Sequence, residues 1–262
     1  EKGLNWEDFW KEGHNNKIYM CHGKDNIVFH SIILNALLLG QKEDYHLVDV
    51  IVSTEYLNYN DQKFSKSKKI GITAKEALEL YPVDSLRYHL VSNGPEKKDT
   101  NFTPDLFLAT HNGELLNKFG NLVNRTIKFK NLEKIKLAKI DDEIKNKINS
   151  IYDEVGNLIE KLEFRDAVSR IMDFVELANK YYDTQEPWKQ RKENEEAFYC
   201  TIFTCANIIA NLSNLFEPIM PETCDKIRRY LDLNEVSWKP VFLDKEIDLT
   251  GKEIDPLFER LK

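Results

Sequence analysis

The hydrophobic pattern of this chain changes its period near Ala74, and that change limits the folds the chain can adopt. Before Ala74, two short apolar runs at residues 19–22 and 47–52 read as strands, with a mostly apolar helix expected over residues 26–39. A strand, a helix and a second strand make one right-handed crossover unit of a doubly wound parallel sheet. After Ala74 the apolar spacing is three and four, which predicts helices. We therefore expect an α/β segment followed by a mainly α-helical bundle.

One crossover unit is not a complete sheet. We therefore expect further residues N-terminal to Glu1, absent either because the sequence is a fragment or because evolution has truncated it. Ligands of such sheets bind beyond the carboxyl ends of the strands. Residues 23–25 and the loop after Val52 both follow strands, so two segments distant in sequence are expected to face one site.

The helical part shows a clear start signal and three apolar stripes. Thr103, Pro104 and Asp105 predict a helix start, with a hydroxyl cap, a proline in the first turn and an acid at the positive end of the dipole. The tail from Val236 is less periodic, and we expect residues 244–248 and 255–258 to wrap the bundle as an extended strap. The stripes are Leu115, Leu116, Phe119, Leu122 and Val123; Phe164, Ala167, Val168, Ile171, Val175 and Ala178; and Ile202, Cys205, Ala206, Ile209, Leu212 and Leu215.

Charge and cysteine content narrow the function classes. A net charge of −7 argues against a general nucleic-acid coat, but residues 118–139 hold seven Lys or Arg and one acid, Glu133. That stretch is either a positioned phosphate contact or a solvated helix face. The apolar run 32–39 is too short to span a bilayer. The four cysteines lack metal spacing and read as reduced thiols, so we expect a cytoplasmic protein with no metal bound by this segment.

The segment Lys63 to Lys69 carries the strongest chemical signal. It contains four lysines and two serines, and no acid interrupts it. Such a cluster on a mobile loop can hold a polyphosphate and follow its charge as a bond breaks. Taken alone, the same residues also fit an ordinary basic surface loop.

In context, the segment Lys63-Phe64-Ser65-Lys66-Ser67 resembles the lysine–serine (KMSKS) loop of class I aminoacyl-tRNA synthetases. The words at residues 23–30 and 53–59, with Gly71, look like methionyl-tRNA synthetases of the eukaryotic cytosolic type. The resemblance implies the end of a Rossmann-type catalytic domain at residues 1–60, a loop and linking helical segment at 61–110, and an α-helical anticodon-binding domain at 111–262. The HIGH signature of the family would lie upstream of Glu1.

The resemblance also implies a function, methionine–tRNA ligase, with methionine, ATP accompanied by Mg²⁺, and tRNA(Met) as partners. Lys66 would be the main catalytic cation and Lys63 its helper, while His30 would lie beside methionine. From the residues alone, Asp25 could instead cap a helix and His30 could be a packed core histidine. The implied ATP-binding residues are Gly23, Asp25, Leu57, Lys63, Ser65, Lys66 and Ser67.

A polar ridge on the first long helix is the candidate RNA contact. Asn117, Asn121 and Arg125 recur every four residues, and Asn and Arg suit the edges of unstacked bases. The resemblance of residues 120–125 implies that Asn121 and Arg125 contact the anticodon, and Trp188 is likewise implied to stack on one of its bases. Asn117 joins this candidate site by its place on the ridge. The alternatives are an interhelix hydrogen bond for Asn121 and simple packing for Trp188.

Two departures from the family pattern and two rival functions remain. Lys68 and Lys69 stand where the family often has Arg-Gly, and Phe64 replaces methionine.

The first rival function is a catalytically silent, synthetase-like tRNA-binding protein. The second is a different class I synthetase, against which the words at 120–125 and 186–188 argue. Asp84 and Arg87 are expected to be structural, and nothing implies an oligomer or a membrane.

Overall fold

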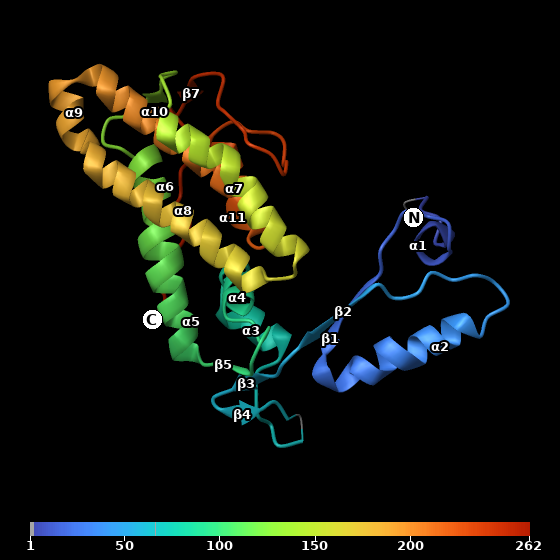
Figure 1. Cartoon of the computed structure of the whole chain (residues 1–262). Helices are drawn as coiled ribbons and strands as arrows, with labels where there is room; N and C mark the ends of the chain where they lie inside the picture. Colours follow the sequence, from blue (N-terminus) through green and yellow to red (C-terminus); the bar gives the residue numbers. More distant parts are fainter. Residues whose placement is uncertain (1–2, 66) are drawn as a thin grey trace. The chain divides into compact units, whose positions relative to one another are not determined.

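A computed structural model describes residues 3–65 and 67–262 of the chain. The chain forms two compact units, one of residues 1–71 and 94–102 and the other of residues 72–93 and 103–262. The segment expected to link the domains, residues 61–110, is thus shared between the two units. The α/β portion followed by a helical bundle confirms the expected fold class (Figure 1).

The first unit contains the expected crossover. Strands β1 (Tyr19–Gly23) and β2 (Val50–Thr54) pair in parallel, with Tyr19 opposite Val50. Between them lie a 3₁₀ turn (Lys24–Asn26), a π-helical turn (Phe29–Ile33) and helix α2 (Leu34–Leu39). Strand β2 begins three residues later than the sequence pattern predicts. The Val48 amide donates to the Asn35 side chain instead of joining the ladder.

A second small sheet presents the basic loop. Its strands β4 (Gln62–Lys63), β3 (Leu57–Tyr59) and β5 (Thr100–Phe102) lie in that order, with β3 and β4 antiparallel. Asn60 and Asp61, which join β3 to β4, both have positive φ, as a tight two-residue hairpin requires. A short helix, α1 (Glu7–Trp10), completes this unit.

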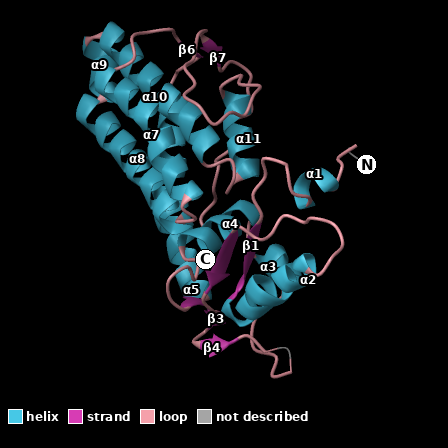
Figure 2. Ribbon diagram, turned by 45° about the vertical axis from the view of Figure 1, so that its right-hand side comes forward, coloured by secondary structure: helices cyan, strands magenta, loops and turns pink. Residues whose placement is uncertain are grey.

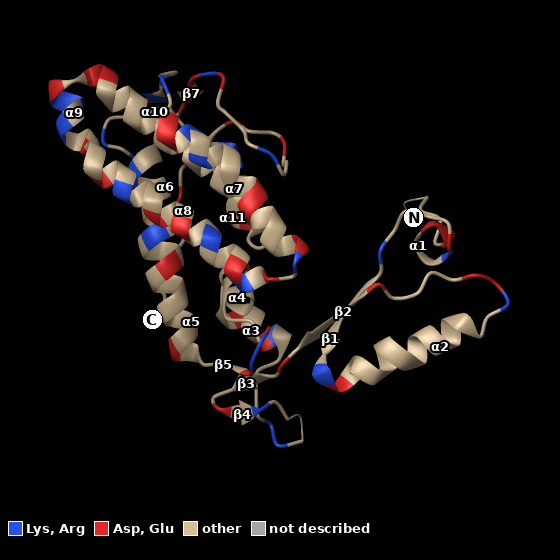
Figure 3. Ribbon diagram, viewed as in Figure 1, with Lys and Arg blue, Asp and Glu red and all other residues tan. Residues whose placement is uncertain are grey.

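Apolar side chains of the first unit are largely uncovered. Of its described residues, only Gly94 and Phe102 are buried. The helical connection exposes Val28, Phe29, Ile32 and Leu37 by 54–63% each. Figure 3 shows α2 without charged residues, so this helix presents apolar side chains rather than a solvated face.

The second unit is an α-helical bundle (Figure 2), and it contains an extensive buried core. Three long helices pack against one another, and α10 is buried on all sides from Thr201 to Leu215. The elements of this unit are α3 (Ala74–Leu80), α4 (Val83–Ser92), α5 (Pro104–Thr110), the π-helical segment His111–Gly120, α6 (Asn121–Ile127), β6 (Lys134–Ile135), α7 (Asp142–Glu160), α8 (Phe164–Gln185), α9 (Pro187–Glu193), α10 (Glu195–Leu215), α11 (Pro221–Tyr230) and β7 (Ile247–Asp248).

Local signals set the helix starts, and the stripes fill the core. Thr103 caps α5 by accepting from the Leu106 amide, as predicted. The three stripes are buried or packed against the core except Phe164, which is 37% exposed because it begins α8. As expected, Asp84 and Arg87 have structural contacts. Asp84 accepts from the Thr223 amide, and Arg87 donates to carbonyls before α11.

The C-terminal residues lie along the bundle, as expected for residues 244–248 and 255–258, where Ile247 and Phe258 are buried, and the contact begins earlier, at Val241. Asn211 of α10 binds both the amide and the carbonyl of Val241, and Asn207 accepts from the Leu243 amide. Farther along, Phe258 is buried against Phe119. Buried asparagine side chains therefore supply the hydrogen bonds that an irregular segment cannot make with itself.

Candidate functional site

The turn after β1 and the start of β3 come together within the first unit. Gly23 ends β1, and Asp25 lies in the 3₁₀ turn that follows. The Asp25 carboxylate does not cap this turn; it accepts a hydrogen bond from the Tyr56 hydroxyl. Leu57 begins β3 directly after Tyr56 and is half-buried. Parallel strands thus bring two of the predicted ATP residues, Gly23 and Asp25, to one end of the sheet.

Ion pairs fix the backbone around this point. The Lys24 ammonium contacts Glu55 and lies 3.2 Å from the Asp99 carboxylate. Asp99 also accepts from the Tyr56 amide at 2.9 Å, and together these donors hold the pKa of Asp99 below its usual value, the backbone bond most of all. Glu55 donates its amide to the Pro95 carbonyl. Three separate segments are therefore tied together beside Asp25.

The lysine–serine loop closes on itself through backbone bonds. The amide and carbonyl of Ser65 pair with those of Ile70, each at 3.0 Å, and the Ser65 and Ser67 hydroxyls are 3.2 Å apart. A cavity of about 430 Å³ is lined by Gln62, Lys63, Phe64, Ser65, Lys68 and Ile70. Lys66 lies outside the described residues. The described part of the loop offers ammonium groups and hydroxyls along one hollow, the donors that a polyphosphate needs.

Gly71 ends this loop in a conformation that suits glycine. Its φ is +117°, and a Cβ there would lie 2.2 Å from the Phe64 ring. Any other residue would meet both backbone strain and a steric clash. Gly71 lies two places beyond the position where the family usually has glycine. The Phe64 ring, which replaces the family's methionine, packs so close to Gly71 that no larger residue fits there.

His30 is neither free nor in a core. Its ring stacks on His22 with centroids 4.7 Å apart, and its Nδ1 lies 3.0 Å from the Asn26 carbonyl. His22 has a buried Nε2 without a partner among the described residues. The packed-core alternative for His30 does not fit, because His30 is only half-buried.

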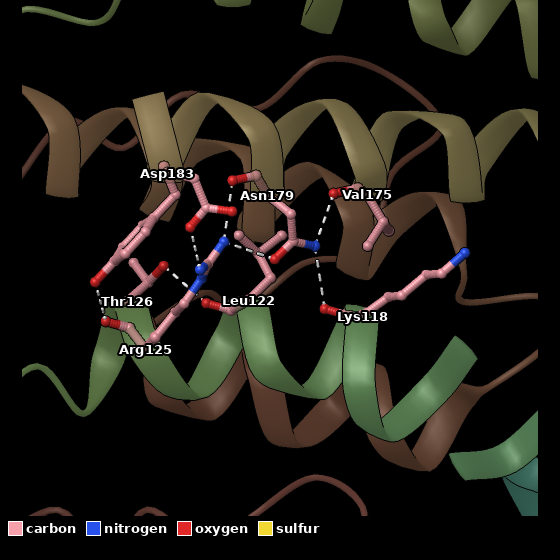
Figure 4. A network of polar contacts seen from close by, with 8 residues as sticks. Lys118, Leu122, Arg125, Thr126, Val175, Asn179 and Asp183 are labelled. Atoms are coloured by element: carbon pink, nitrogen blue, oxygen red, sulfur yellow. Dashed lines mark hydrogen bonds and ion pairs between the residues drawn. The ribbon is translucent and has the colours of Figure 1, made fainter. Parts of the chain in front are cut away.

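In the second unit, Arg125 is bound to α8 (Figure 4). Its Nη1 donates to Asp183 at 2.7 Å, and its Nη2 donates to the carbonyl and the side-chain oxygen of Asn179. The guanidinium also lies 4.2 Å above the Tyr182 ring, whose hydroxyl donates to the Arg125 carbonyl. Arg125 is therefore held rigidly rather than projecting freely.

The other predicted RNA contacts differ in their surroundings. Trp188 is 46% exposed, and its ring centroid is 6.3 Å from that of Tyr182, which places it beside Arg125's stacking partner. Asn121 is exposed, and its side chain makes no hydrogen bond with another described residue. Asn117 is exposed too, but Arg260 donates to it at 3.4 Å. The structure thus groups Arg125 with Trp188 through Tyr182.

The basic stretch 118–139 is only partly neutralised. Its ion pairs are Lys118 with Glu176, Arg125 with Asp183, Lys134 with Asp248, Lys136 with Glu195 and Lys139 with Asp142. Lys128 and Lys130 are exposed and have no ion pair within the described part of the chain. Figure 3 shows more basic residues on nearby α9. Lys128 and Lys130 can therefore meet phosphates without an acid of the described residues competing for them.

Family models match both parts of the chain. Residues 1–127 match the model described as tRNA synthetases class I (M), and residues 141–252 match the anticodon-binding domain of tRNA ligases. The chain belongs to the class I methionyl-tRNA synthetases. It is 42% identical to the methionine–tRNA ligase of Bacillus mycoides strain KBAB4, over 100% of this chain and 47% of that protein. It is also 42% identical to the methionine–tRNA ligase of Bacillus cereus strain AH187, over 97% of this chain and 46% of that protein.

Solved structures agree on the fold. Mycobacterium tuberculosis methionyl-tRNA synthetase bound by methionyl-adenylate matches with a TM-score of 0.81 at 22% identity, covering 92% of this chain and 50% of that one. The apo form of the same enzyme matches with a TM-score of 0.79 at 23% identity, and the match covers 94% of this chain and 50% of that one. The chain thus spans about half the length of the curated relatives and solved structures it matches. The named relatives are bacterial, so the expected eukaryotic cytosolic type is not supported.

Among the described residues, no helix combines the length and the apolar character of a bilayer span. They also contain no group of three or more His, Cys, Asp or Glu that could hold a metal ion.

Sequence reasoning overlooked the partners of the predicted residues. Tyr56 contacts Asp25, and Tyr182, Asn179 and Asp183 surround Arg125. The spacing of the last three, at 179, 182 and 183, puts them on one helix face and is a usable signal. Tyr56 had no such signal, because its contact with Asp25 depends on strand pairing.

Proposed function

We propose that this chain is the half of a methionine–tRNA ligase that carries the lysine–serine loop and the anticodon-binding domain. The identity of 42% along the whole chain to methionine–tRNA ligases carries the proposal. The complete protein would join methionine to ATP, release pyrophosphate and pass the methionyl group to tRNA(Met). We place this reaction in the cytoplasm, in keeping with four free thiols.

In this proposal the first unit handles ATP. A methionine carboxylate attacks the α-phosphorus, and negative charge builds on the departing pyrophosphate. Lys66 and Lys63 would meet that charge, with hydrogen bonds from Ser65 and Ser67, and cations that act on charge present only in the transition state raise the rate. Mg²⁺ would arrive with the phosphates of ATP, since the described residues form no metal-binding group.

The remaining predicted residues would position the substrates. Gly23 and Leu57 would line the ATP site, and the Asp25 carboxylate would accept from the ribose hydroxyls, since an ionised carboxylate is acceptor-only. His30 would lie by the methionine side chain. In the second unit, Asn117, Asn121 and Arg125 would contact the anticodon and Trp188 would stack on one of its bases. The exposed ring of Trp188 beside Tyr182 and Arg125 supports this assignment.

The test is methionine-dependent exchange between ATP and pyrophosphate. The complete synthetase is expected to catalyse it, and the isolated chain is not, because orientation of both substrates accounts for a large share of such barriers. Exchange by the purified chain alone would contradict the assignment of half of the site to the rest of the protein. No exchange by the complete protein would favour the silent tRNA-binding alternative.

A further inference from the structure

Tyr56 lies between the two groups to which the proposed function gives ATP chemistry. Its hydroxyl donates to the Asp25 carboxylate, and the Lys63 ammonium lies 4.0 Å from the centre of its ring. The Lys24 ammonium lies 4.2 Å from the same centre. Resting on the proposed function, we propose that Tyr56 is a positioning residue for adenylate formation, which orients Asp25 for the ribose and holds Lys63 ready for the phosphates.

The hydroxyl acts on the orientation of the carboxylate. A carboxylate has about four lone-pair sites, so one bond from Tyr56 leaves the others for two ribose hydroxyls. Asp25 is exposed on a short turn and receives no cap bond from that turn. Tyr56 is thus the group that restrains its rotation. Without the hydroxyl, the carboxylate would have to be ordered by ATP itself, at a cost in affinity.

The Tyr56 ring can hold the Lys63 ammonium in place without using its N–H donors, which a carboxylate partner would occupy. Within the described part of the chain, Lys63 forms no ion pair. A cation held over an aromatic face keeps its charge and its N–H donors available, whereas an acidic partner would occupy them. Lys24 differs, because Glu55 and Asp99 already bind it. Lys24 therefore anchors the ring, and Lys63 is the cation that remains free to act.

The backbone of Tyr56 is fixed as well. Its amide donates to Asp99, and the neighbouring Glu55 amide donates to the Pro95 carbonyl. A side chain that orders others has to be ordered itself, and these bonds supply that order. Because Tyr56 acts through Asp25 and Lys63, its role is positioning rather than catalysis.

The test uses the complete synthetase in the pyrophosphate exchange assay, with ATP and with 2′-deoxy-ATP. Tyr56→Phe removes the hydroxyl and keeps the ring. We expect KM for ATP to rise about tenfold with kcat within about twofold, as for the loss of a hydrogen bond to a charged group. The preference for ATP over 2′-deoxy-ATP should fall as well, because the 2′-hydroxyl loses its ordered acceptor. Tyr56→Leu should in addition lower kcat about fivefold, the size of a cation–π contact.

Tyr59→Phe is the matched control. The Tyr59 hydroxyl makes no hydrogen bond within the described residues, so its loss should leave KM, kcat and the nucleotide preference unchanged. An active wild type together with a Tyr56→Phe enzyme of normal KM and normal preference would overturn the role of Tyr56 and leave the proposed function intact. A wild type without exchange would overturn both.

Discussion

The guanidinium of Arg125 is already engaged before any RNA binds. Asp183 and Asn179 take both terminal nitrogens, and Tyr182 supports its face, while Nε is buried without a partner among the described residues. Because the planar guanidinium is already fixed in this way, the Arg125 side chain would lose little conformational entropy on binding a base. A base that Arg125 contacts must therefore fit a rigid donor whose charge Asp183 partly offsets.

Under the proposed function, Lys66 is the residue on which the loop chemistry would depend most. In the complete synthetase, Lys66→Ala should slow adenylate formation about a hundredfold, the usual cost of one transition-state contact. Methionine affinity should change little, because the lysine acts on charge that develops later. Pre-steady-state rates and methionine titration measure the two effects. The control is Lys75→Ala, a change of the same type on α3 outside the loop; a normal rate with weakened methionine binding would assign Lys66 to ground-state contact.

Trp188 tests the anticodon assignment in the isolated chain. Stacking of one base contributes roughly 1–3 kcal/mol, so Trp188→Ala should weaken binding of a CAU stem-loop about tenfold or more. A stem-loop of unrelated anticodon should be little affected. Titration of both RNAs at one salt concentration measures this.

Lys130→Ala is the comparison for Trp188. Lys130 is exposed and lies in the basic stretch, so its loss should weaken both RNAs alike, since phosphate contacts carry no sequence information. Equal losses on both RNAs after Trp188→Ala would mean that the indole only packs against Tyr182.

At the scale of elements, α10 holds the C-terminal strap through a buried asparagine. Asn211 binds both backbone groups of Val241 and accepts from the Tyr152 hydroxyl. Asn211→Ala should lower the free energy of unfolding by about 2–4 kcal/mol, because several buried polar groups lose their partner. Asn157→Ala, on the exposed face of α7, should change it by less than about 0.5 kcal/mol. Urea unfolding measures both; equal small effects would show that the strap is held by its apolar residues alone.

Two buried histidines make stability depend on pH: His89 of α4 meets Thr110 of α5, and His111 connects α4 to the C-terminal tail. Burial lowers the pKa of His89 to about 4, and burial also lowers the pKa of His111, whose ring nitrogens meet Ser85 and the Glu259 carbonyl. Both are therefore neutral in the fold but titrate near 6.5 when unfolded. The contribution of His89 is complete above pH 6.5 and is lost as pH falls toward 4, and that of His111 is lost in the same direction.

The melting temperature should accordingly fall between pH 7 and pH 5. His89→Gln cannot titrate and should show a smaller fall over this range than the wild type, even if it is less stable at pH 7. Thermal unfolding at the two pH values measures this. An equal fall in the variant and the wild type would show that other groups cause the pH dependence.

The elements that sequence could predict are those set by local signals. Thr103 and Pro104 marked the start of α5, and the stripe ending at Leu215 marked the central helix. The contacts that escaped prediction join distant segments, such as Tyr56 to Asp25 or Asn35 to Val48, which delays β2. Periodicity reports which face of an element is apolar, but it does not say which polar group from elsewhere meets it. The site residues were therefore easier to name than their partners.

At the scale of the whole molecule, the two units differ in how well they are packed. The helical unit buries an extensive core, whereas the described part of the first unit buries only Gly94 and Phe102. Apolar contacts supply most of the stability of a fold. Local opening should therefore cost far less in the first unit than in the second.

Amide hydrogen exchange tests this contrast in the isolated chain. The amides of β1, β2 and α2 should exchange at least about a hundredfold faster than those of α8 and α10, since local opening free energies range from near zero up to the global value. Because the chain spans about half the length of its relatives, we expect the rest of the synthetase to cover Val28, Ile32 and Leu37. The complete protein should then protect residues 19–54 strongly, while α10 changes little. Equal protection of both units in the isolated chain would show that the first unit is stable without that cover, and its exposed apolar face would need another explanation.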